Sequence, residues 1–221
     1  MIGHGVMIVD DHPVVREGYR RLIDLQPGLR IVAEACDARS AYDRFRDMRP
    51  DIVVMDVTLP GASGIEAIRH IRQYDGTARI VVFTMHQGSA FALKAIEAGA
   101  AGYVTKSSDP DVLIDAIAGV LAGRRMFSPD VIEAIARDRI AGTGIGLANL
   151  TARQTEILRL IADGWPMEDI ADTLSVSLKT VRNNHYQIKG ILGFETDAQL
   201  VWFAIESGLL NVGLRGQGGS P

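Results

Sequence analysis

The stretch "VMIVDDHPVV", residues 6–15, places four apolar residues directly before two carboxylates, Asp10 and Asp11. A short apolar run of this kind predicts a buried β-strand. Adjacent carboxylates at the end of a buried strand repel each other and are costly to desolvate. We therefore expect a positive charge, from a metal ion or a basic side chain, beside this pair.

Four further short apolar runs follow at 31–35, 52–55, 80–83 and 101–104, and segments with helical spacing separate them. Short buried strands that alternate with amphipathic helices are typical of βαβ units, which build a parallel sheet covered on both faces. The sequence therefore predicts an α/β domain with a five-stranded parallel sheet over residues 1–122.

The pattern changes after residue 122. The segment 128–139 predicts one helix, because Ser128 is a suitable N-cap and Pro129 occupies the first helical position. The next segment, "AGTGIGLAN" at 141–149, has three glycines and no charge and predicts a flexible linker. We assign residues 123–148 to a linker that contains one helix.

No strand-like run follows residue 149, which predicts a small all-α domain over 149–211. Thr151 and Gln154 form a capping box at the start of its first helix, and Gly164 is suited to the C-terminal end. The other predicted helices cover 167–174, 178–192 and about 196–207. The second and third of the four helices have helix-turn-helix spacing, and the tail 212–221 is expected to be disordered.

Composition narrows the class of protein. The 221 residues carry a net charge of −4, which does not favour non-specific binding to nucleic acid or membrane. A single cysteine, Cys36, excludes an intrachain disulfide framework. We find neither a signal-peptide pattern nor an apolar run long enough to span a membrane, and expect a cytoplasmic protein with no membrane partner.

Polar residues follow the predicted strands where each one ends. Asp10 and Asp11 follow the first strand, Asp56 the third, Thr84 the fourth and Lys106 the fifth. Ligands of open parallel sheets bind beyond these carboxyl ends, so we expect the five side chains in one crevice. Clustered carboxylates suit Mg²⁺. An ammonium and a hydroxyl beside them would bind phosphoryl oxygens, with one aspartate as the nucleophile.

The segments "VDDH", "MDVTLPG", "VVFTMH" and "GYVTKS" resemble the receiver domain of two-component response regulators in order and spacing. The resemblance implies a flavodoxin-like (βα)5 fold with Asp56 as phosphoacceptor and Tyr103 as switch aromatic. It implies that Thr84 and Lys106 bind phosphoryl oxygens. The implied Mg²⁺ ligands are the side chains of Asp11 and Asp56, the backbone carbonyl of Thr58, and Asp10 through water. We also single out His86 as a residue that tunes loss of the phosphoryl group.

The predicted helix 178–192 contains Lys179, Arg182 and Lys189 but no acidic residue. The C-terminal sequence resembles the LuxR-type helix-turn-helix of NarL/FixJ response regulators, except that histidine stands at His185 where the family has it one position earlier. The resemblance implies DNA contacts by this basic helix. The implied DNA-side residues are Lys179 and Thr180 on phosphates, Arg182 and Asn183 on base edges, and Tyr186, with Lys189 as a further basic residue.

Together the two resemblances predict a transcriptional response regulator that is not an enzyme beyond its own phosphoryl transfer and loss. A sensor histidine kinase would phosphorylate Asp56, drawing Thr84 to the phosphoryl group and Tyr103 inward. The receiver would otherwise mask the recognition helix. Activation would then release a homodimer that binds double-stranded DNA, with RNA polymerase as a further partner.

Two other functions fit parts of the sequence. A haloacid-dehalogenase-type phosphatase also uses an aspartyl nucleophile, but it needs a second aspartate two residues later, where this chain has Thr58. The second alternative is a DNA-binding protein switched by a small molecule or a partner protein. The intact acidic cluster argues against a switch of that kind.

Overall fold

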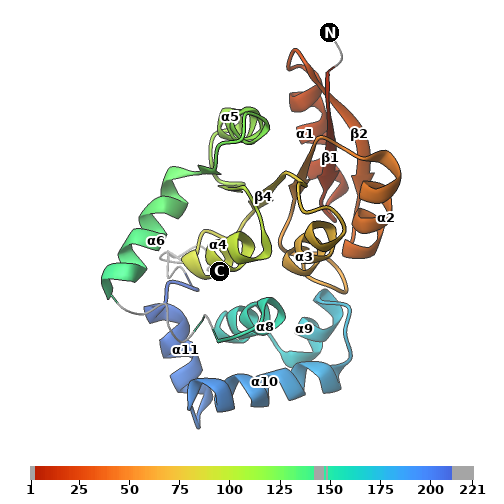
Figure 1. Ribbon diagram of the computed structural model, residues 1–221. Helices are drawn as coiled ribbons and strands as arrows, with labels where there is room; N and C mark the ends of the chain where they lie inside the picture. Colours follow the sequence, from red (N-terminus) through yellow and green to blue (C-terminus); the bar gives the residue numbers. More distant parts are fainter. Residues whose placement is uncertain (1–2, 142–146, 148, 211–221) are drawn as a thin grey trace, which may run out of the picture.

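A computed structural model describes residues 3–141, 147 and 149–210 of the chain (Figure 1). It has a receiver part built on one sheet and a C-terminal helical part. The strands are β1 (His4–Val9), β2 (Leu29–Ala35), β3 (Ile52–Met55), β4 (Ile80–Thr84), β5 (Gly102–Thr105) and β6 (Met126–Phe127). The helices of the receiver part are α1 (Pro13–Asp24), α2 (Ala38–Met48), α3 (Gly64–Tyr74), α4 (Ser89–Ala98) and α5 (Pro110–Leu121). The remaining helices are α6 (Pro129–Ala141), α8 (Ala152–Ala162), α9 (Met167–Thr173), α10 (Leu178–Leu192) and α11 (Asp197–Glu206).

The sheet has the strand order β2-β1-β3-β4-β5-β6, and every pair is parallel. The parallel α/β class is thus confirmed, but the expected number of strands was wrong. The sixth strand, β6, pairs Met126 with Gly102 and Phe127 with Tyr103. A strand of two residues is too short to show the alternation from which strands are predicted.

Side chains of each central strand alternate between two cores, as the period of a strand requires. On one face Met7 and Val9 of β1 pack in a cluster with Phe45 of α2 and Ile68 of α3. On the other face Val6 and Ile8 of β1 lie in a cluster with residues of α1 and α5. Because both faces are covered, all strand residues of β3, β4 and β5 are buried. The carboxyl ends of these strands are therefore fixed.

The helical part is organised around Val181 and Ile188 of α10, both fully buried. The predicted capping box at Thr151 and Gln154 is confirmed at the start of α8. Gly164 has a φ of +84° directly after this helix, a conformation that favours glycine. Most of the predicted linker at 141–149 and the predicted tail lie outside the described residues.

The helical part rests on the receiver through α8, which packs beside α4, while α10 lies on the side away from the sheet (Figure 1). The exposed positions of α10 include Lys179 and Arg182. The expectation that the receiver masks the recognition helix was therefore wrong for this arrangement. The receiver covers α8 instead, because α8 presents buried residues such as Ala152 and Glu156 to it.

Within the described residues, none of the helices has the length and apolar character needed to cross a membrane.

Candidate functional site

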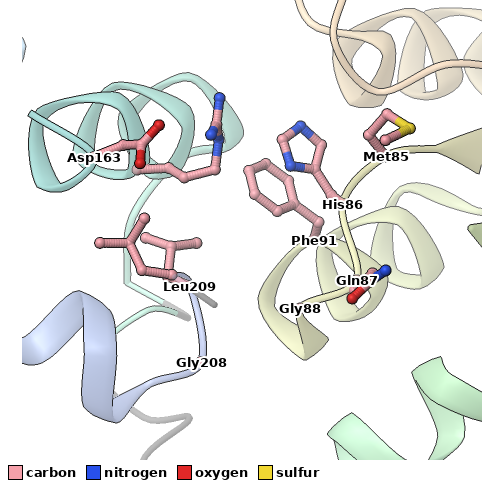
Figure 2. Close-up of a pocket in the computed structure, with 10 residues that line it drawn as sticks. Met85, His86, Gln87, Gly88, Phe91, Asp163, Gly208 and Leu209 are labelled. Atoms are coloured by element: carbon pink, nitrogen blue, oxygen red, sulfur yellow. The ribbon is translucent and has the colours of Figure 1, made fainter. Parts of the chain in front are cut away.

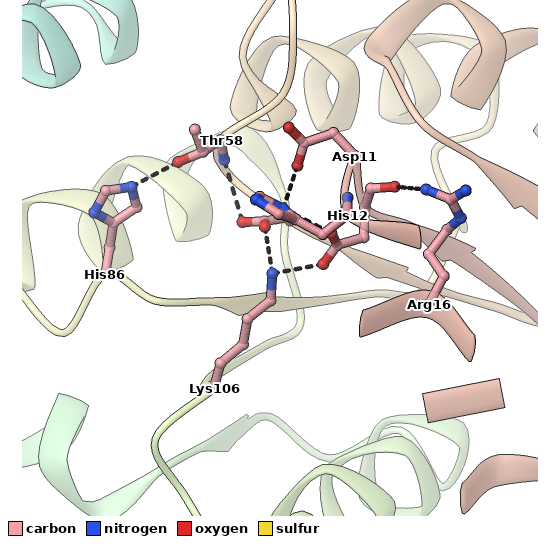
Figure 3. A network of polar contacts seen from close by, with 8 residues as sticks. Asp11, His12, Arg16, Thr58, His86 and Lys106 are labelled. Carbon is pink, nitrogen blue, oxygen red and sulfur yellow. Dashed lines mark hydrogen bonds and ion pairs between the residues drawn. The ribbon is translucent and has the colours of Figure 1, made fainter. Parts of the chain in front are cut away.

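Three residues predicted at strand ends meet at the carboxyl end of the sheet. The ammonium of Lys106 donates to Asp10 Oδ2 and to Asp56 Oδ2, each at 2.5 Å (Figure 3). Asp10 and Asp56 are 2% and 4% exposed, so both carboxylates are removed from water. Lys106 is thus a positive charge of the kind expected beside the first strand. It binds Asp10 directly and joins it to Asp56.

Burial and charge oppose each other at Asp56. Burial raises the pKa of its carboxyl group above the ordinary value, and Lys106 works in the other direction. Burial alone would lower the pKa of Lys106, but the charges of Asp56 and Asp10 outweigh it and raise this pKa. Lys106 therefore favours the charged form of Asp56, which burial disfavours.

The β3–α3 loop holds Asp56 in place through a close backbone approach. Gly64, the first residue of α3, donates its N–H to the Val57 carbonyl at 2.8 Å. A Cβ atom at this position would lie 1.8 Å from the backbone oxygen of Asp56. Any side chain at Gly64 would therefore force the β3–α3 loop to move.

Asp11 extends the acidic group at the end of β1. Its Oδ1 atom is buried, and among the described residues it has no hydrogen bond of ordinary geometry, although His12 Nδ1 lies 2.7 Å away. Asp10, Asp11 and His12 can bring ligand atoms within 4.8 Å of one another. A buried carboxylate oxygen without an ordinary hydrogen bond, next to the carboxylate of Asp10, fits a hard cation such as Mg²⁺. The His12 imidazole was not singled out from the sequence, although it is adjacent in "VDDH".

Thr84 and Tyr103 both lie inside the protein. The Thr84 hydroxyl is buried and has no hydrogen-bond partner of good geometry among the described residues, yet it is near enough to help lower the pKa of Asp56. The Tyr103 ring is fully buried, and its hydroxyl donates to the His86 carbonyl at 2.9 Å. The inward position expected to follow phosphorylation is already present for Tyr103 in this structure.

His86 lies between the two parts of the protein. Its Nε2 atom is 2.8 Å from Thr58 Oγ1 (Figure 3). The same atom is 3.4 Å from Glu156 Oε2 of α8. Burial lowers the pKa of the imidazole, and Glu156 opposes this. The contact with Glu156 could not be predicted from the sequence, because no local spacing relates α8 to the β4–α4 loop.

A cavity of about 290 Å³ opens beside His86 at the junction of the two parts (Figure 2). Figure 2 shows His86 and Phe91 on the receiver side and Asp163 and Leu209 on the helical side. The junction is therefore only partly filled near the β4–α4 loop.

The predicted DNA-side residues occupy α10 in different environments. Lys179, Arg182 and Asn183 are exposed, and Tyr186 is 80% exposed. Arg182 is 3.7 Å from the Glu168 carboxylate, an exposed pair that costs little to break. These side chains face solvent without strong competing partners among the described residues.

Two other positions of α10 are more constrained. Thr180 Oγ1 lies 2.8 Å from the hydroxyl of Ser177, the N-cap of this helix. The Lys189 ammonium donates to Asp197 Oδ1 at 2.8 Å, and His185 Nε2 lies 2.8 Å from the same oxygen. Asp197 belongs to α11, so Lys189 is tied to its own domain. It would have to leave this pair to contact DNA.

Two family models match the chain. The response regulator receiver domain matches residues 6–118, and the model for bacterial regulatory proteins of the luxR family matches residues 148–204. The chain belongs to the response regulator family. The luxR-family model in the C-terminal part and the relatives that match the chain place this response regulator in the NarL/FixJ type.

Relatives match over nearly the whole chain. Response regulator UvrY of Escherichia coli K12 is 33% identical over 93% of this chain and 95% of its own. A two-component response regulator of the LuxR family from Aurantimonas is 66% identical over 62% of this chain and 99% of the solved chain, with a TM-score of 0.61. Salmonella enterica RcsB, solved bound to promoter P1flhDC with the phosphomimetic BeF3-, is 25% identical over 91% and 98%, with a TM-score of 0.65.

Proposed function

We propose that this response regulator is a phosphorylation-dependent transcription factor with Asp56 as its phosphoacceptor. The observation that carries the proposal is the position of Lys106, whose ammonium lies 2.5 Å from the carboxylates of both Asp10 and Asp56. A buried carboxylate beside a lysine ammonium suits phosphoryl transfer, which depends mainly on positioning and charge stabilisation.

The reaction needs little beyond these groups. An Asp56 oxygen attacks the phosphorus of a phosphohistidine on a sensor kinase; a P–O bond forms, the P–N bond breaks, and the imidazole leaves and takes up a proton. Lys106 stabilises charge on the transferred oxygens, and the Thr84 hydroxyl is available to donate to another. Asp10, Asp11, Asp56 and the Thr58 carbonyl would hold Mg²⁺, which supplies further charge stabilisation when bound.

DNA binding is assigned to the exposed face of α10. Lys179, Arg182, Asn183 and Tyr186 supply donors and a ring at helical spacing, and the buried Val181 and Ile188 fix the helix from behind. A helix of this kind enters the major groove, and two copies read half-sites about one DNA turn apart. The promoter-bound structure of RcsB supports this assignment. The protein would act in the cytoplasm as a homodimer, with RNA polymerase as a further partner.

The proposal assigns no substrate turnover to the protein. A phosphatase that uses an aspartyl nucleophile would need an acid two residues after Asp56, and the hydroxyl of Thr58 at that position bonds His86 instead. The absence of that acid favours a regulator that carries out only its own phosphoryl transfer and loss.

The test is phosphoryl uptake from acetyl phosphate with Mg²⁺, measured as the mass of the intact chain. Wild type should gain one phosphoryl group and Asp56→Asn none. Asp47→Asn, which removes an exposed carboxylate of α2, is the matched control and should behave as wild type. Uptake by Asp56→Asn equal to that of wild type would refute the site.

A further inference from the structure

A chain of polar contacts runs from the phosphoacceptor loop to the DNA-binding domain. The Thr58 N–H donates to Asp56 Oδ1 at 3.2 Å, and the Thr58 hydroxyl lies 2.8 Å from His86 Nε2. The same nitrogen lies 3.4 Å from Glu156 Oε2 on α8. We call Thr58, His86 and Glu156 the interdomain polar chain. It connects the aspartate, through Thr58 and His86, to a residue of the other domain.

The members of this chain are shielded from water at the junction. Glu156 is 6% exposed, and the side chain of His86 is 10% exposed. Glu156 also pairs with Arg159 of the same helix, at 3.0 Å. Groups buried in this way lose more when a partner leaves than exposed ones do, because water cannot replace the contact. Separating His86 from Glu156 therefore costs free energy that another interaction must offset.

His86 is held on two further sides. Its ring stacks on Phe91 of α4 with centroids 4.1 Å apart and an interplanar angle of 20°. Its carbonyl accepts a hydrogen bond from Tyr103. A movement of the β4–α4 loop therefore reaches Tyr103, α4 and Glu156 together.

We propose that Glu156 is a positioning residue of the phosphorylation site: acting through His86, it holds Thr58 and the β4–α4 loop in a conformation that resists phosphorylation of Asp56. This inference rests on the proposed function. His86 lies two residues after Thr84, whose buried hydroxyl has no good partner within the described residues. When Thr84 is drawn to the phosphoryl oxygens, the loop carries His86 with it and the contact with α8 is lost.

The coupling must act in both directions. If docking of α8 disfavours phosphorylation, phosphorylation must disfavour docking by the same factor. The DNA-facing side of α10 is exposed while α8 is docked, so the contact does not work by covering that helix. Its loss instead frees the orientation of the helix-turn-helix relative to the receiver, which two copies need in order to reach two half-sites.

The test compares Glu156→Ala and the isosteric Glu156→Gln with Glu195→Gln in the full chain. Glu195 is an exposed carboxylate of the same domain. Hydrogen exchange without a phosphodonor reports the contact, and the initial rate of uptake from acetyl phosphate with Mg²⁺ reports the coupling. We expect exchange at residues 85–91 and the uptake rate each to rise about fivefold in Glu156→Ala, the lower end of typical couplings. Glu156→Gln should show a smaller rise and Glu195→Gln none.

Two results would overturn the inference. Unchanged exchange at residues 85–91 would show that Glu156 does not hold the loop. Faster exchange with an unchanged uptake rate would show a purely structural contact. If wild type itself takes up no phosphoryl group, the proposed function is refuted. That result differs from the two results above, which overturn only the role of Glu156.

Discussion

The proposed phosphorylation site and the proposed DNA-facing side of α10 are built in opposite ways. Asp56 is 4% exposed and held by a buried ammonium, whereas Tyr186 is 80% exposed and the nearest carboxylate to Arg182 is 3.7 Å away in an exposed pair. At the first site each charge depends on its neighbour. On α10 the side chains act separately in water. Single changes should therefore abolish function at the first site and only weaken it at the second.

The largest effect is expected from Lys106→Met, which tests this dependence directly. Without the ammonium, the buried carboxylates of Asp10 and Asp56 face each other and the transferred oxygens lose a donor. We expect the rate of phosphorylation by acetyl phosphate to fall about 100-fold or more, the cost of losing one such stabilising group. Arg44→Met removes an exposed cation of α2 and should change the rate little. A fall of less than about threefold in Lys106→Met would show that phosphorylation does not depend on the Lys106 ammonium.

A smaller and graded effect is expected on α10. Arg182→Ala should lower affinity for a DNA site selected from a random pool by about 1–3 kcal/mol and relax the sequence preference. Lys179→Met should weaken binding to all sequences alike and reduce the salt dependence. Fluorescence anisotropy at several salt concentrations measures both. Complete loss of binding in either variant, with helix content intact, would show that the α10 residues are as interdependent as those around Asp56.

Asp197 is the residue of the DNA-binding domain that tests whether the side chains of α10 depend on their neighbours. It holds Lys189 and His185 at 2.8 Å each, and Lys189 is the leading cause that keeps its pKa below the ordinary value. Asp197→Asn removes a negative charge and releases Lys189, so DNA affinity should rise by about twofold, as for exposed ion pairs. A lower affinity in the same anisotropy assay, with unchanged helix content, would show that the pair orients α10.

An effect on stability alone is expected away from both regions, at the N-cap of α2. Asp37 accepts the Ser40 N–H at 2.8 Å, and this bond is the main reason that its pKa lies below the ordinary 3.8. A lowered carboxyl pKa stabilises the fold fully above pH 3.8, and this stability is lost as the pH falls through the folded-state pKa. Asp37→Ala should cost about 1 kcal/mol at pH 7.

This loss should shrink when denaturant unfolding is repeated at pH values from 3.8 down through the folded-state pKa, where wild type also loses the charge of Asp37. A difference between the two proteins that stays constant with pH would show that the bond to Ser40 does not depend on the carboxylate. Phosphoryl uptake at pH 7 should be unchanged in this variant.

The sequence predicted the buried elements well, because buried strands and capping residues leave local patterns. Runs such as "IVVM" before Asp56 marked the strands and their order along the chain. The two-residue β6 leaves no such pattern and was missed. We could predict that Asp10, Asp56 and Lys106 lie close together, because the carboxyl ends of parallel strands meet at one edge of the sheet.

Contacts between separate helices and loops could not be predicted in the same way. The pairing of His86 with Glu156 and of Lys189 with Asp197 depends on how helices pack, which no residue spacing records. For the same reason the resemblance suggested a covered recognition helix, whereas the receiver packs on α8. Local sequence determines which segments form helices and strands. Long-range packing determines which faces of these helices and strands stay exposed to solvent.

In the proposed function, Asp56 accepts the phosphoryl group within the cluster neutralised by Lys106. The most direct measurement is to phosphorylate the full chain with acetyl phosphate and Mg²⁺, trap the acyl phosphate by hydride reduction, and locate the modified residue by peptide mass spectrometry. We predict modification at Asp56 and a large loss of it in Lys106→Met. Modification at another residue, or equal modification of Asp56 in Lys106→Met, would contradict the account.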